Sequence, residues 1–329
     1  MTSDAADALK TLLPPEAAPR LQSLRLADGC ATLVLDATGL GAPGRDALEA
    51  SVRQALNGAP GVTEVRVAMM ADKNPESGKN TGPQIVAIGS GKGGVGKSTV
   101  AANLAVALAR AGHKVGLVDA DIYGPSQARL LGTEGSRPVA HDNRLVPIAS
   151  QWGVPVLSMA HLAEPGQAIA WRGPMASGAL TQLLEGHWDE AEVLIVDLPP
   201  GTGDIQLTML QKFKPAGAVI VSTPQDLALM DATRAAELFA KGAVPVIGVI
   251  ENMAGYTCPH CGEVSDPFGS GGAEAAAGHM GTGFLGRIPL DIAIRREGDA
   301  GTPTAAGEGP QAQAFADLAG KIADWLETH

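Results

Sequence analysis

The sequence predicts an α/β fold, in which one domain is built on a mostly parallel sheet flanked by helices and a small α/β domain precedes it. Three observations lead to this prediction. From residue 84 onward, short apolar runs alternate with helical stretches. Runs of this kind are typical of parallel strands that are buried on both faces. A glycine-rich segment at 89–99 joins the first run to a helix, and a polar stretch at 71–83 separates this region from the one before it.

The chain divides into a small α/β domain at 1–72, a linker at 73–83 and a larger domain at 84–329. In the small domain, we expect helices at 4–13 and 45–56 and strands at 31–35 and 62–68. In the larger domain, the apolar pattern predicts strands at 85–88, 115–119, 193–197, 218–222, 244–250 and 283–288. It predicts helices at 100–110, 230–241 and 311–326, and the last should dock its apolar face on the sheet.

The composition indicates a protein of the cytoplasm. The chain has 329 residues, of which 45% are hydrophobic, and a formal net charge of -11. This charge argues against broad nucleic-acid binding and against a polybasic membrane-binding surface. No apolar run approaches the length of a transmembrane helix, and the N-terminal segment lacks the features of a targeting peptide. We therefore expect a cytoplasmic protein with no nucleic acid and no membrane among its partners.

The segment at 89–99 contains a full phosphate-binding loop pattern, G-x-x-x-x-G-K-S, which runs from Gly91 to Ser98. Glycines let backbone N–H groups surround phosphate oxygens, and the N-terminus of the following helix adds partial positive charge. Lys97 should reach the β- and γ-phosphates, and the Ser98 hydroxyl should ligate Mg²⁺. The larger domain is therefore expected to be a P-loop NTPase. The predicted nucleotide-binding residues of this segment are Gly91, Lys92, Gly93, Gly94, Val95, Gly96, Lys97, Ser98 and Thr99.

Carboxylates follow two further predicted strands. Asp119 and Asp121 end the strand at 115–119, and Asp197 ends the strand at 193–197. Ligands of such sheets bind at the carboxyl ends of the strands, so these acids should converge on the phosphate loop. There they could orient a water or bind Mg²⁺ through water, although Asp119 could instead cap the next element. The loop after Asp197, PPGTG, resembles a switch segment that senses the γ-phosphate.

Cys258 and Cys261 form a C-x-x-C pair late in the larger domain. Such a pair is half of a metal site, since tetrahedral zinc and cubane clusters normally take four ligands. Two copies of the chain would supply four thiolates across a symmetry axis. An intrachain redox pair and an incomplete or structural site are the alternatives, and His260 is expected to be a neighbour rather than a ligand.

Together these motifs resemble a known family. The loop GKGGVGKST at 91–99 is similar to the deviant Walker A loop of the MinD/ParA/nitrogenase-iron-protein class of ATPases. The segments at 118–126, 197–204, 222–226 and 251–253, followed by CPHC at 258–261, resemble the Mrp/ApbC group of iron–sulfur cluster carriers. The first domain resembles the small iron–sulfur-assembly domain of bacterial members. It is degenerate, because 39–44 lacks the cysteine common there.

The resemblance implies a homodimeric ATPase that uses ATP/ADP and Mg²⁺, binds a [4Fe–4S] cluster and passes it from an assembly scaffold to apo-proteins. It implies that Lys92 is catalytic across the dimer and that Asp121 orients the attacking water. Asp197 would support Mg²⁺, and Asn252 would recognise the adenine base. Cys258 and Cys261 would hold the cluster between two subunits. The alternative is a MinD/ParA-like positioning or partitioning ATPase, which would have a basic patch or a basic amphipathic C-terminus.

Overall fold

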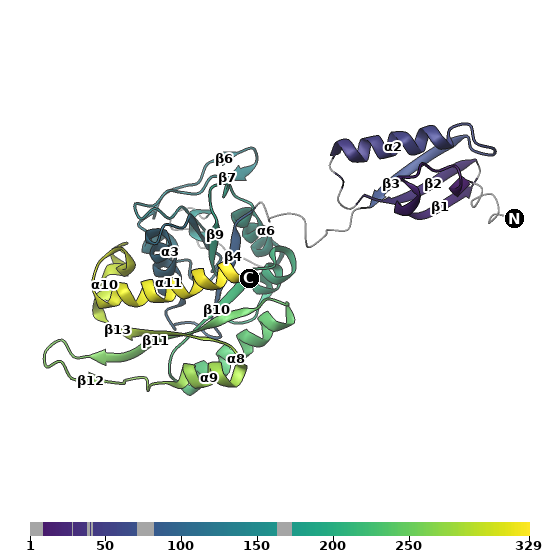
Figure 1. The fold of residues 1–329 in the computed structure, drawn as a ribbon. Helices are drawn as coiled ribbons and strands as arrows, with labels where there is room; N and C mark the ends of the chain where they lie inside the picture. Colours follow the sequence, from purple (N-terminus) through teal and green to yellow (C-terminus); the bar gives the residue numbers. More distant parts are fainter. Residues whose placement is uncertain (1–8, 28, 38–39, 41, 71–81, 163–172) are drawn as a thin grey trace. The chain divides into compact units, whose positions relative to one another are not determined.

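The computed structural model describes residues 9–27, 29–37, 40, 42–70, 82–162 and 173–329. The chain divides into two compact units, Met1–Thr81 and Gly82–His329, and each has its own hydrophobic core. Figure 1 shows the elements of both units. The first half of the helix expected at 4–13 and most of the linker expected at 73–83 fall outside the described residues; of the second half, residues 9–10 are helical.

The first unit is a three-stranded sheet with one long helix. Its central strand pairs antiparallel with the strand before it and parallel with the strand after it. Leu48, Val52 and Leu56 of the helix enter the core, because residues four apart lie on one helix face. The first strand was not predicted. The elements are η1 (Ala18–Arg20), β1 (Leu21–Ala27), β2 (Cys30–Asp36), α2 (Ala42–Leu56) and β3 (Glu64–Met70).

The second unit contains a large sheet whose strands lie in the order β12-β11-β10-β4-β9-β5-β8, with β13 also beside β11. All of its neighbouring pairs are parallel except β11 with β12, which confirms the mostly parallel sheet. A separate two-stranded sheet is formed by β6 and β7. The strands are β4 (Gln84–Gly89), β5 (Val115–Asp119), β6 (Ala140–His141), β7 (Arg144–Leu145), β8 (Val156–Ser158), β9 (Val193–Asp197), β10 (Gly217–Ser222), β11 (Val246–Thr257), β12 (Val264–Ser265) and β13 (Phe284–Leu290).

Helices cover both faces of this sheet. Alternate residues of a strand point to opposite faces, so Val86 and Ile88 of β4 enter one core while Ala87 enters the other. The helices are α3 (Lys97–Arg110), α4 (Gln127–Leu130), α5 (Met159–Leu162), α6 (Gly173–Leu184), α7 (Asp204–Thr208), η2 (Met209–Phe213), α8 (Asp226–Lys241), α9 (Gly272–Met280), α10 (Ile292–Asp299), η3 (Thr304–Ala306) and α11 (Pro310–Thr328).

The C-terminal helix α11 docks on the domain as expected. Phe315, Leu318 and Ile322 are buried in the core that also contains Leu104 of α3. Figure 1 shows α11, in yellow, beside α3. Its apolar face is therefore already used inside the domain. Among all helices that the structure describes, none is long and apolar enough to cross a membrane.

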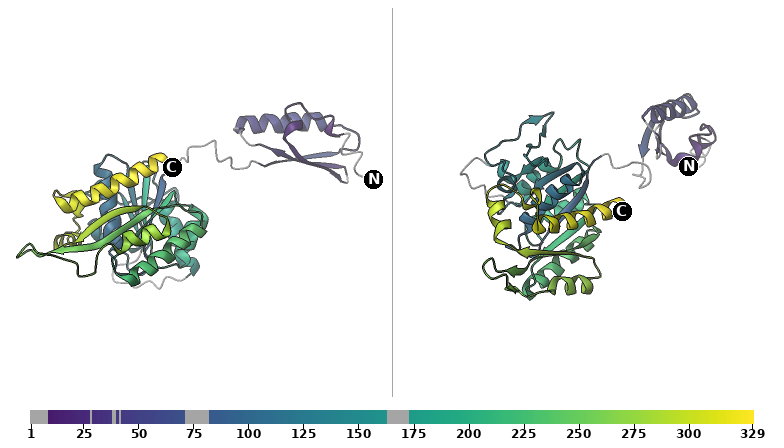
Figure 2. Two further views of the ribbon diagram at one scale, coloured as in Figure 1. Left: turned by 60° about the horizontal axis from the view of Figure 1, so that its bottom comes forward. Right: turned by 60° about the vertical axis from the view of Figure 1, so that its left-hand side comes forward.

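Strand β11 is longer than predicted. The strand expected at 244–250 runs instead from Val246 to Thr257, and its last residues pair with the short strand β12. Figures 1 and 2 show this β11–β12 ribbon projecting from the domain. The extension was missed because the polar residues Glu251 and Asn252 end the apolar run in the sequence. Beyond them, the strand is irregular, with positive φ values of 60° at Met253 and 73° at Gly255. We call residues 253–270 the cysteine ribbon, since they contain both Cys258 and Cys261.

Candidate functional site

The phosphate loop follows β4 at the centre of the sheet, between β9 and β10. Its backbone turns through Gly94 and Gly96, whose φ values of 81° and 79° favour glycine. A Cβ on Gly96 would lie 2.2 Å from the amide nitrogen of Asn252, and one on Gly91 would lie 2.1 Å from the backbone of Asp231. The loop conformation thus requires glycine for two separate reasons.

A cavity of about 260 Å³ lies over this loop. It is open at the N-terminus of α3, a helix of 14 residues whose first N–H groups favour an anion. Asp121, Gly124 and Pro200 complete its wall, so segments from the ends of β4, β5 and β9 converge here. The glycine backbone, the helix N-terminus and the buried lysine described next fit a nucleotide polyphosphate with Mg²⁺.

Lys97 is buried beneath the cavity, with only 6% of its surface exposed. Its ammonium group forms an ion pair with the completely buried Asp197. The same nitrogen lies 3.9 Å from a carboxylate oxygen of Asp121 and 3.4 Å from the hydroxyl of Ser98. The lysine that the loop pattern assigns to phosphate is therefore paired with a carboxylate of the same domain.

Asp119 lies deeper than a group that contacts phosphate would. Its carboxylate is fully buried and accepts hydrogen bonds from the hydroxyl of Ser158 at 2.8 Å and from the backbone N–H of Gln127 at 3.0 Å. It thus caps the short helix α4, as one of the two interpretations from sequence expected. Burial, and after it the neighbouring carboxylate of Asp197, raise the pKa of Asp119 to about 7.

Gln127 is a residue that the sequence analysis missed. Its side chain is completely buried, and its amide nitrogen donates to the carbonyl of Ser98 at 2.9 Å and to Asp197 at 2.8 Å. Its amide oxygen has no partner among the residues that the structure describes. A lone glutamine in a four-residue helix carries no motif, so only the fold could reveal that it joins the phosphate loop to Asp197.

Asp121 lies at the edge of the cavity, as predicted for an acid near the phosphates. One of its carboxylate oxygens accepts from the backbone N–H groups of Tyr123 and Gly124, at 3.0 and 3.2 Å. The other oxygen faces the Lys97 ammonium. The turn after β5 therefore fixes this carboxylate and leaves one oxygen directed toward the cavity.

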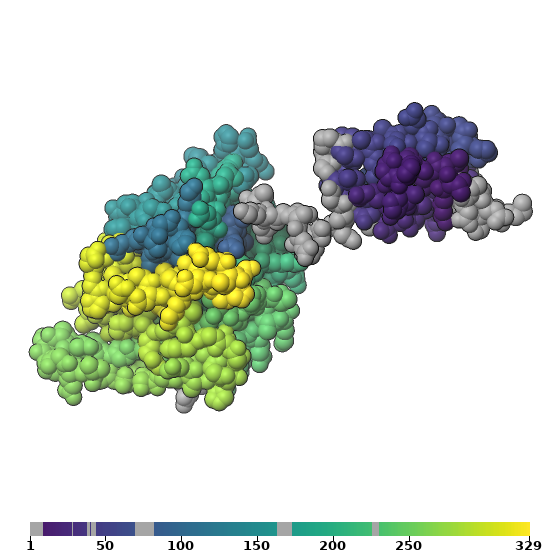
Figure 3. Space-filling model, viewed as in Figure 1, coloured from purple at the N-terminus to yellow at the C-terminus, as the bar shows by residue number. Residues whose placement is uncertain are grey.

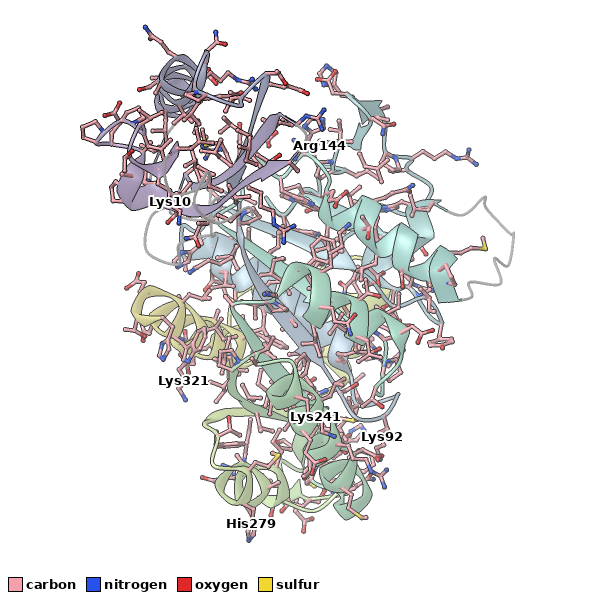
Figure 4. All side chains as sticks on the ribbon, turned by 90° about the vertical axis from the view of Figure 1, so that its right-hand side faces the viewer. Lys10, Lys92, Arg144, Lys241, His279 and Lys321 are labelled. Carbon is pink, nitrogen blue, oxygen red and sulfur yellow. The ribbon has the colours of Figure 1, made fainter. Side chains whose placement is uncertain are left out.

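Two neighbouring segments hold the loop from outside. The half-buried Lys92, labelled in Figure 4, donates to the side-chain oxygen of Gln225 at 3.4 Å. The backbone N–H of Gly201, in the expected switch segment after β9, donates to the carbonyl of Ser90 at 3.0 Å. The loop is thus in direct contact with a segment whose sequence suggested nucleotide-dependent movement.

Asn252 also contacts the phosphate loop. Its amide nitrogen donates to the carbonyl of Val95 at 2.8 Å, and the residue is 8% exposed. The predicted site residues Lys97, Asp121, Asp197 and Asn252 are therefore gathered around one loop.

The two cysteines lie elsewhere, on the cysteine ribbon, and neither lines the cavity. Both are free thiols; Cys258 is half-buried and Cys261 is exposed. The chain turns between them so that the N–H of Gly262 donates to the carbonyl of Cys258 at 2.9 Å. Backbone N–H groups of Cys261 and His260 hold the pKa of the Cys258 thiol below its usual value, which favours the thiolate. Figure 3 shows this segment, in green, standing out from the surface.

The cysteine pair is incomplete within one chain. Over the ranges that the structure describes, no three His, Cys, Asp or Glu side chains form a group that could hold a metal ion. The third cysteine, Cys30, begins β2 in the other unit. A four-ligand site on the ribbon therefore needs two ligands besides the cysteines, and the described part of the chain gathers none there.

The central parallel sheet, the glycine loop at the end of β4 and the Lys97–Asp197 pair define a P-loop NTPase. A family model described as NUBPL iron-transfer P-loop NTPase, within the ParA group, matches residues 82–323. The chain belongs to this family.

Two curated relatives support the same assignment. The chain is 54% identical over 224 residues to an iron–sulfur cluster carrier protein of Pseudomonas fragi, an alignment that covers 67% of this chain and 78% of the relative. It is 44% identical over 305 residues to an iron–sulfur cluster carrier protein of Deinococcus radiodurans, covering 90% and 87%. The second alignment extends well into the first unit.

Among solved structures, an ADP complex of a nucleotide-binding protein from Archaeoglobus fulgidus is 38% identical, with a TM-score of 0.62, and covers 70% of this chain and 91% of that one. The cell-division ATPase MinD of Pyrococcus furiosus is 26% identical, with a TM-score of 0.55, and covers 74% and 99%. The resemblance to carriers is thus stronger than the resemblance to MinD. The alternative reading as a positioning or partitioning ATPase is the less supported one.

Proposed function

We propose that this protein is an ATP-hydrolysing carrier that holds a [4Fe–4S] cluster between two copies of the chain and passes it to apo-proteins. The observation that carries the proposal is the pair formed by the half-buried Cys258 and the exposed Cys261, on a ribbon that projects from a P-loop NTPase domain. The names of the curated relatives point to the same cargo.

The cluster is the cargo of this protein, and the chain's own contribution is two thiolates. Cubane clusters normally take four cysteine ligands, and one chain offers two on its ribbon. A second copy, related by a two-fold axis, would supply the matching pair. The exposed position of the ribbon supports this arrangement, since a cargo that must pass to a client protein has to remain accessible.

ATP would be held by residues 91–99, with Lys97 directed at the phosphates and the Ser98 hydroxyl on Mg²⁺. The bound Mg²⁺ would supply charge neutralisation at the phosphates. Asp197 would support it from behind, and Asn252 would contact the adenine base. For Lys97 to reach phosphate, it must give up its ion pair with Asp197, and Gln127 would then keep that carboxylate in place.

Hydrolysis would depend on two further residues. Asp121 has one carboxylate oxygen directed toward the cavity, where it would orient the attacking water. Lys97 would already contact the phosphates within its own chain. The second lysine of the loop, Lys92, would therefore act on the nucleotide of the partner subunit. Slow hydrolysis would change the geometry of the dimer and thereby how tightly the cluster is held. The switch segment around Gly201 would respond to hydrolysis, because it contacts the phosphate loop.

Anaerobic reconstitution with iron and sulfide tests the cargo directly. We expect the wild-type dimer to bind close to four iron and four sulfide per two chains, with broad visible absorbance. Cys258→Ala and Cys261→Ala should each lose that absorbance, whereas Cys30→Ala should keep it. Equal absorbance in all variants, or zinc in place of iron and sulfide, would show the cluster assignment to be wrong.

A further inference from the structure

We propose that Asn252 is a positioning residue that couples the phosphate loop to the cysteine ribbon within one chain, so that filling the loop changes the accessibility of Cys258 and Cys261. This inference rests on the proposed function for its purpose, because it explains how nucleotide would control the hold on the cargo.

The ribbon leaves the domain at the phosphate loop. Asn252 immediately precedes it, and the amide of Asn252 donates to the carbonyl of Val95 at 2.8 Å. Both residues are buried, at 8% and 2% exposure, so this bond is shielded from water. The amide also fills the space that a side chain at Gly96 would need, which leaves it little freedom to move independently of the loop.

The ribbon returns to the domain at the preceding residue of the same strand. The carboxylate of Glu251 is completely buried and accepts from the backbone N–H groups of Gly271 at 3.3 Å and Ala273 at 2.9 Å. Arg287 of β13 adds a charged hydrogen bond at 2.9 Å. Neighbouring residues of a strand point to opposite sides, so Glu251 holds the return point while Asn252 holds the loop. The base of the ribbon is therefore formed at Glu251 and Asn252, and one side of that base is the phosphate loop.

Between this base and the cysteines, β11 is poorly held by the sheet. Its pairing with β13 passes from Asn252–Ile288 directly to Tyr256–Leu290, which leaves extra residues on β11. Met253 and Gly255, with positive φ, lie in this bulge. A bulge bends and twists a strand, so a small displacement of Asn252 would redirect the whole ribbon beyond it.

Binding of phosphates to the loop would supply the difference in interaction energy between two conformations that such a switch needs. A ligand can shift a conformational equilibrium only through unequal interaction with the two states. Phosphates recruit the backbone N–H groups of the loop, and the Val95 carbonyl belongs to that backbone. Its bond to Asn252 is therefore the contact through which the two arrangements of the loop would differ at the ribbon.

The test uses the full-length, cluster-free protein and measures the alkylation rates of its thiols by iodoacetamide, with peptide mass spectrometry. We expect saturating Mg–ADP to change the rates at Cys258 and Cys261 by about fivefold or more, the lower end of the usual range of coupling between sites. Cys30, in the other unit, serves as the internal reference and should not respond. Mg–tripolyphosphate, which has no base, should produce the same response if the phosphate loop is the origin.

Asn252→Ala should abolish the nucleotide response at both cysteines, and Asn252→Asp, which keeps the size but presents no donor to Val95, should do the same. Occupancy is verified separately by calorimetry, so that each variant is compared at saturation. Gln225→Ala is the matched control, because Gln225 contacts the loop at Lys92 but is not on β11. This control should respond like the wild type.

An unresponsive wild type, or Asn252 variants that respond normally, would overturn the coupling. A response to ADP but not to tripolyphosphate would overturn the phosphate loop as the origin of the response, because the adenine base would then be the trigger. These outcomes are separate from failure of the carrier function, which is read from iron and sulfide binding. Thiol rates that respond in a protein without cluster affinity would support the coupling and reject the cargo.

Discussion

The phosphate loop and the cysteine ribbon are both glycine-containing segments that follow strands of the same sheet, but they are built in opposite ways. The loop is enclosed by buried polar groups from four other segments, including Asp197, Gln127 and Asn252. The ribbon projects into solvent and pairs only with itself beyond Thr257. The loop thus gathers its contacts within the domain, whereas the ribbon offers two thiols and no further metal ligands among the described residues.

This difference separates the requirements of binding from those of delivery. A site that must select and hydrolyse a nucleotide gains from fixed groups, since preorganised dipoles and charges do not need to rearrange during the reaction. A site that must release its cargo gains from exposure and from sharing its ligands with another chain. The following substitutions test whether the two regions can be perturbed separately.

Lys97→Met should produce the largest effect. Nucleotide affinity should fall about 100-fold, because hydrogen bonds to charged groups contribute about 1.5–3 kcal/mol. The free energy of unfolding should also fall by about 3 kcal/mol, since Asp197 would remain buried without its cation. Calorimetry and urea unfolding measure the two. Cys258→Ser is the contrast and should change neither, so a similar loss in that variant would contradict the separation of the two regions.

Lys92→Ala should divide binding from turnover. The residue is half-buried and lies outside the Lys97–Asp197 pair. Its loss should therefore leave ADP affinity within about threefold of the wild type, a change in binding free energy smaller than the net contribution of a typical hydrogen bond. ATP hydrolysis should fall at least about tenfold, if the lysine stabilises charge that develops in the partner's nucleotide. Hydrolysis at the wild-type rate would contradict the role assigned to Lys92 across the dimer.

Gln127→Leu should have a moderate effect that depends on Mg²⁺. The variant removes the donor to Asp197 and leaves that buried carboxylate less satisfied, at a cost of about 1–3 kcal/mol in the free energy of unfolding. The gain in nucleotide affinity that Mg²⁺ provides should shrink, while affinity without Mg²⁺ should change little. Gln311→Leu, which breaks an amide–carboxylate bond with Asp291 on the domain surface, controls for loss of such a bond elsewhere. Equal behaviour of the two variants would argue against a role of Gln127 at the site.

The smallest effect should come from pH. His161 is buried and bonded to the N–H of Ser158, whose hydroxyl reaches Asp119; desolvation lowers the pKa of His161 below 6.5. The folded protein therefore resists protonation of this ring more than the unfolded chain does. Stability is complete above the unfolded pKa and is lost as pH falls from there through the folded pKa. His161→Gln should show a smaller decrease in melting temperature between pH 7.5 and 5 than the wild type. An unchanged decrease would show that other groups dominate.

The sequence predicted the parts of this molecule that carry local patterns. Four of the six strands predicted in the larger domain are buried apolar runs close to their expected bounds, and a fifth, β13, lies close to its expected bounds but is only partly buried. The phosphate loop follows from its glycines and Lys97. The length of β11 was underestimated, because the polar residues Glu251 and Asn252 end the apolar run in the sequence. β8 was missed because Val156–Ser158 is too short to show a periodicity.

The contacts of the site were less predictable than its members. Asp119, Asp121 and Asp197 were placed together because carboxyl ends of parallel strands share one edge. Nothing in the sequence indicated that Lys97 would pair with Asp197, or that Gln127 would bridge Ser98 and Asp197. Such contacts depend on side-chain directions that only the assembled sheet determines.

The order of the strands has a consequence for biosynthesis. β4, the strand that leads into the phosphate loop, has β9 and β10 as its neighbours, and β9 begins only at Val193. A ribosome that has released β4 must therefore make nearly a third of the chain before either neighbour exists, and the apolar residues Ile85, Val86 and Ile88 stay unpaired meanwhile. Sheets closed by such distant segments fold slowly and expose strands to aggregation. The first unit, whose three strands are consecutive, can complete its sheet before the phosphate loop is made.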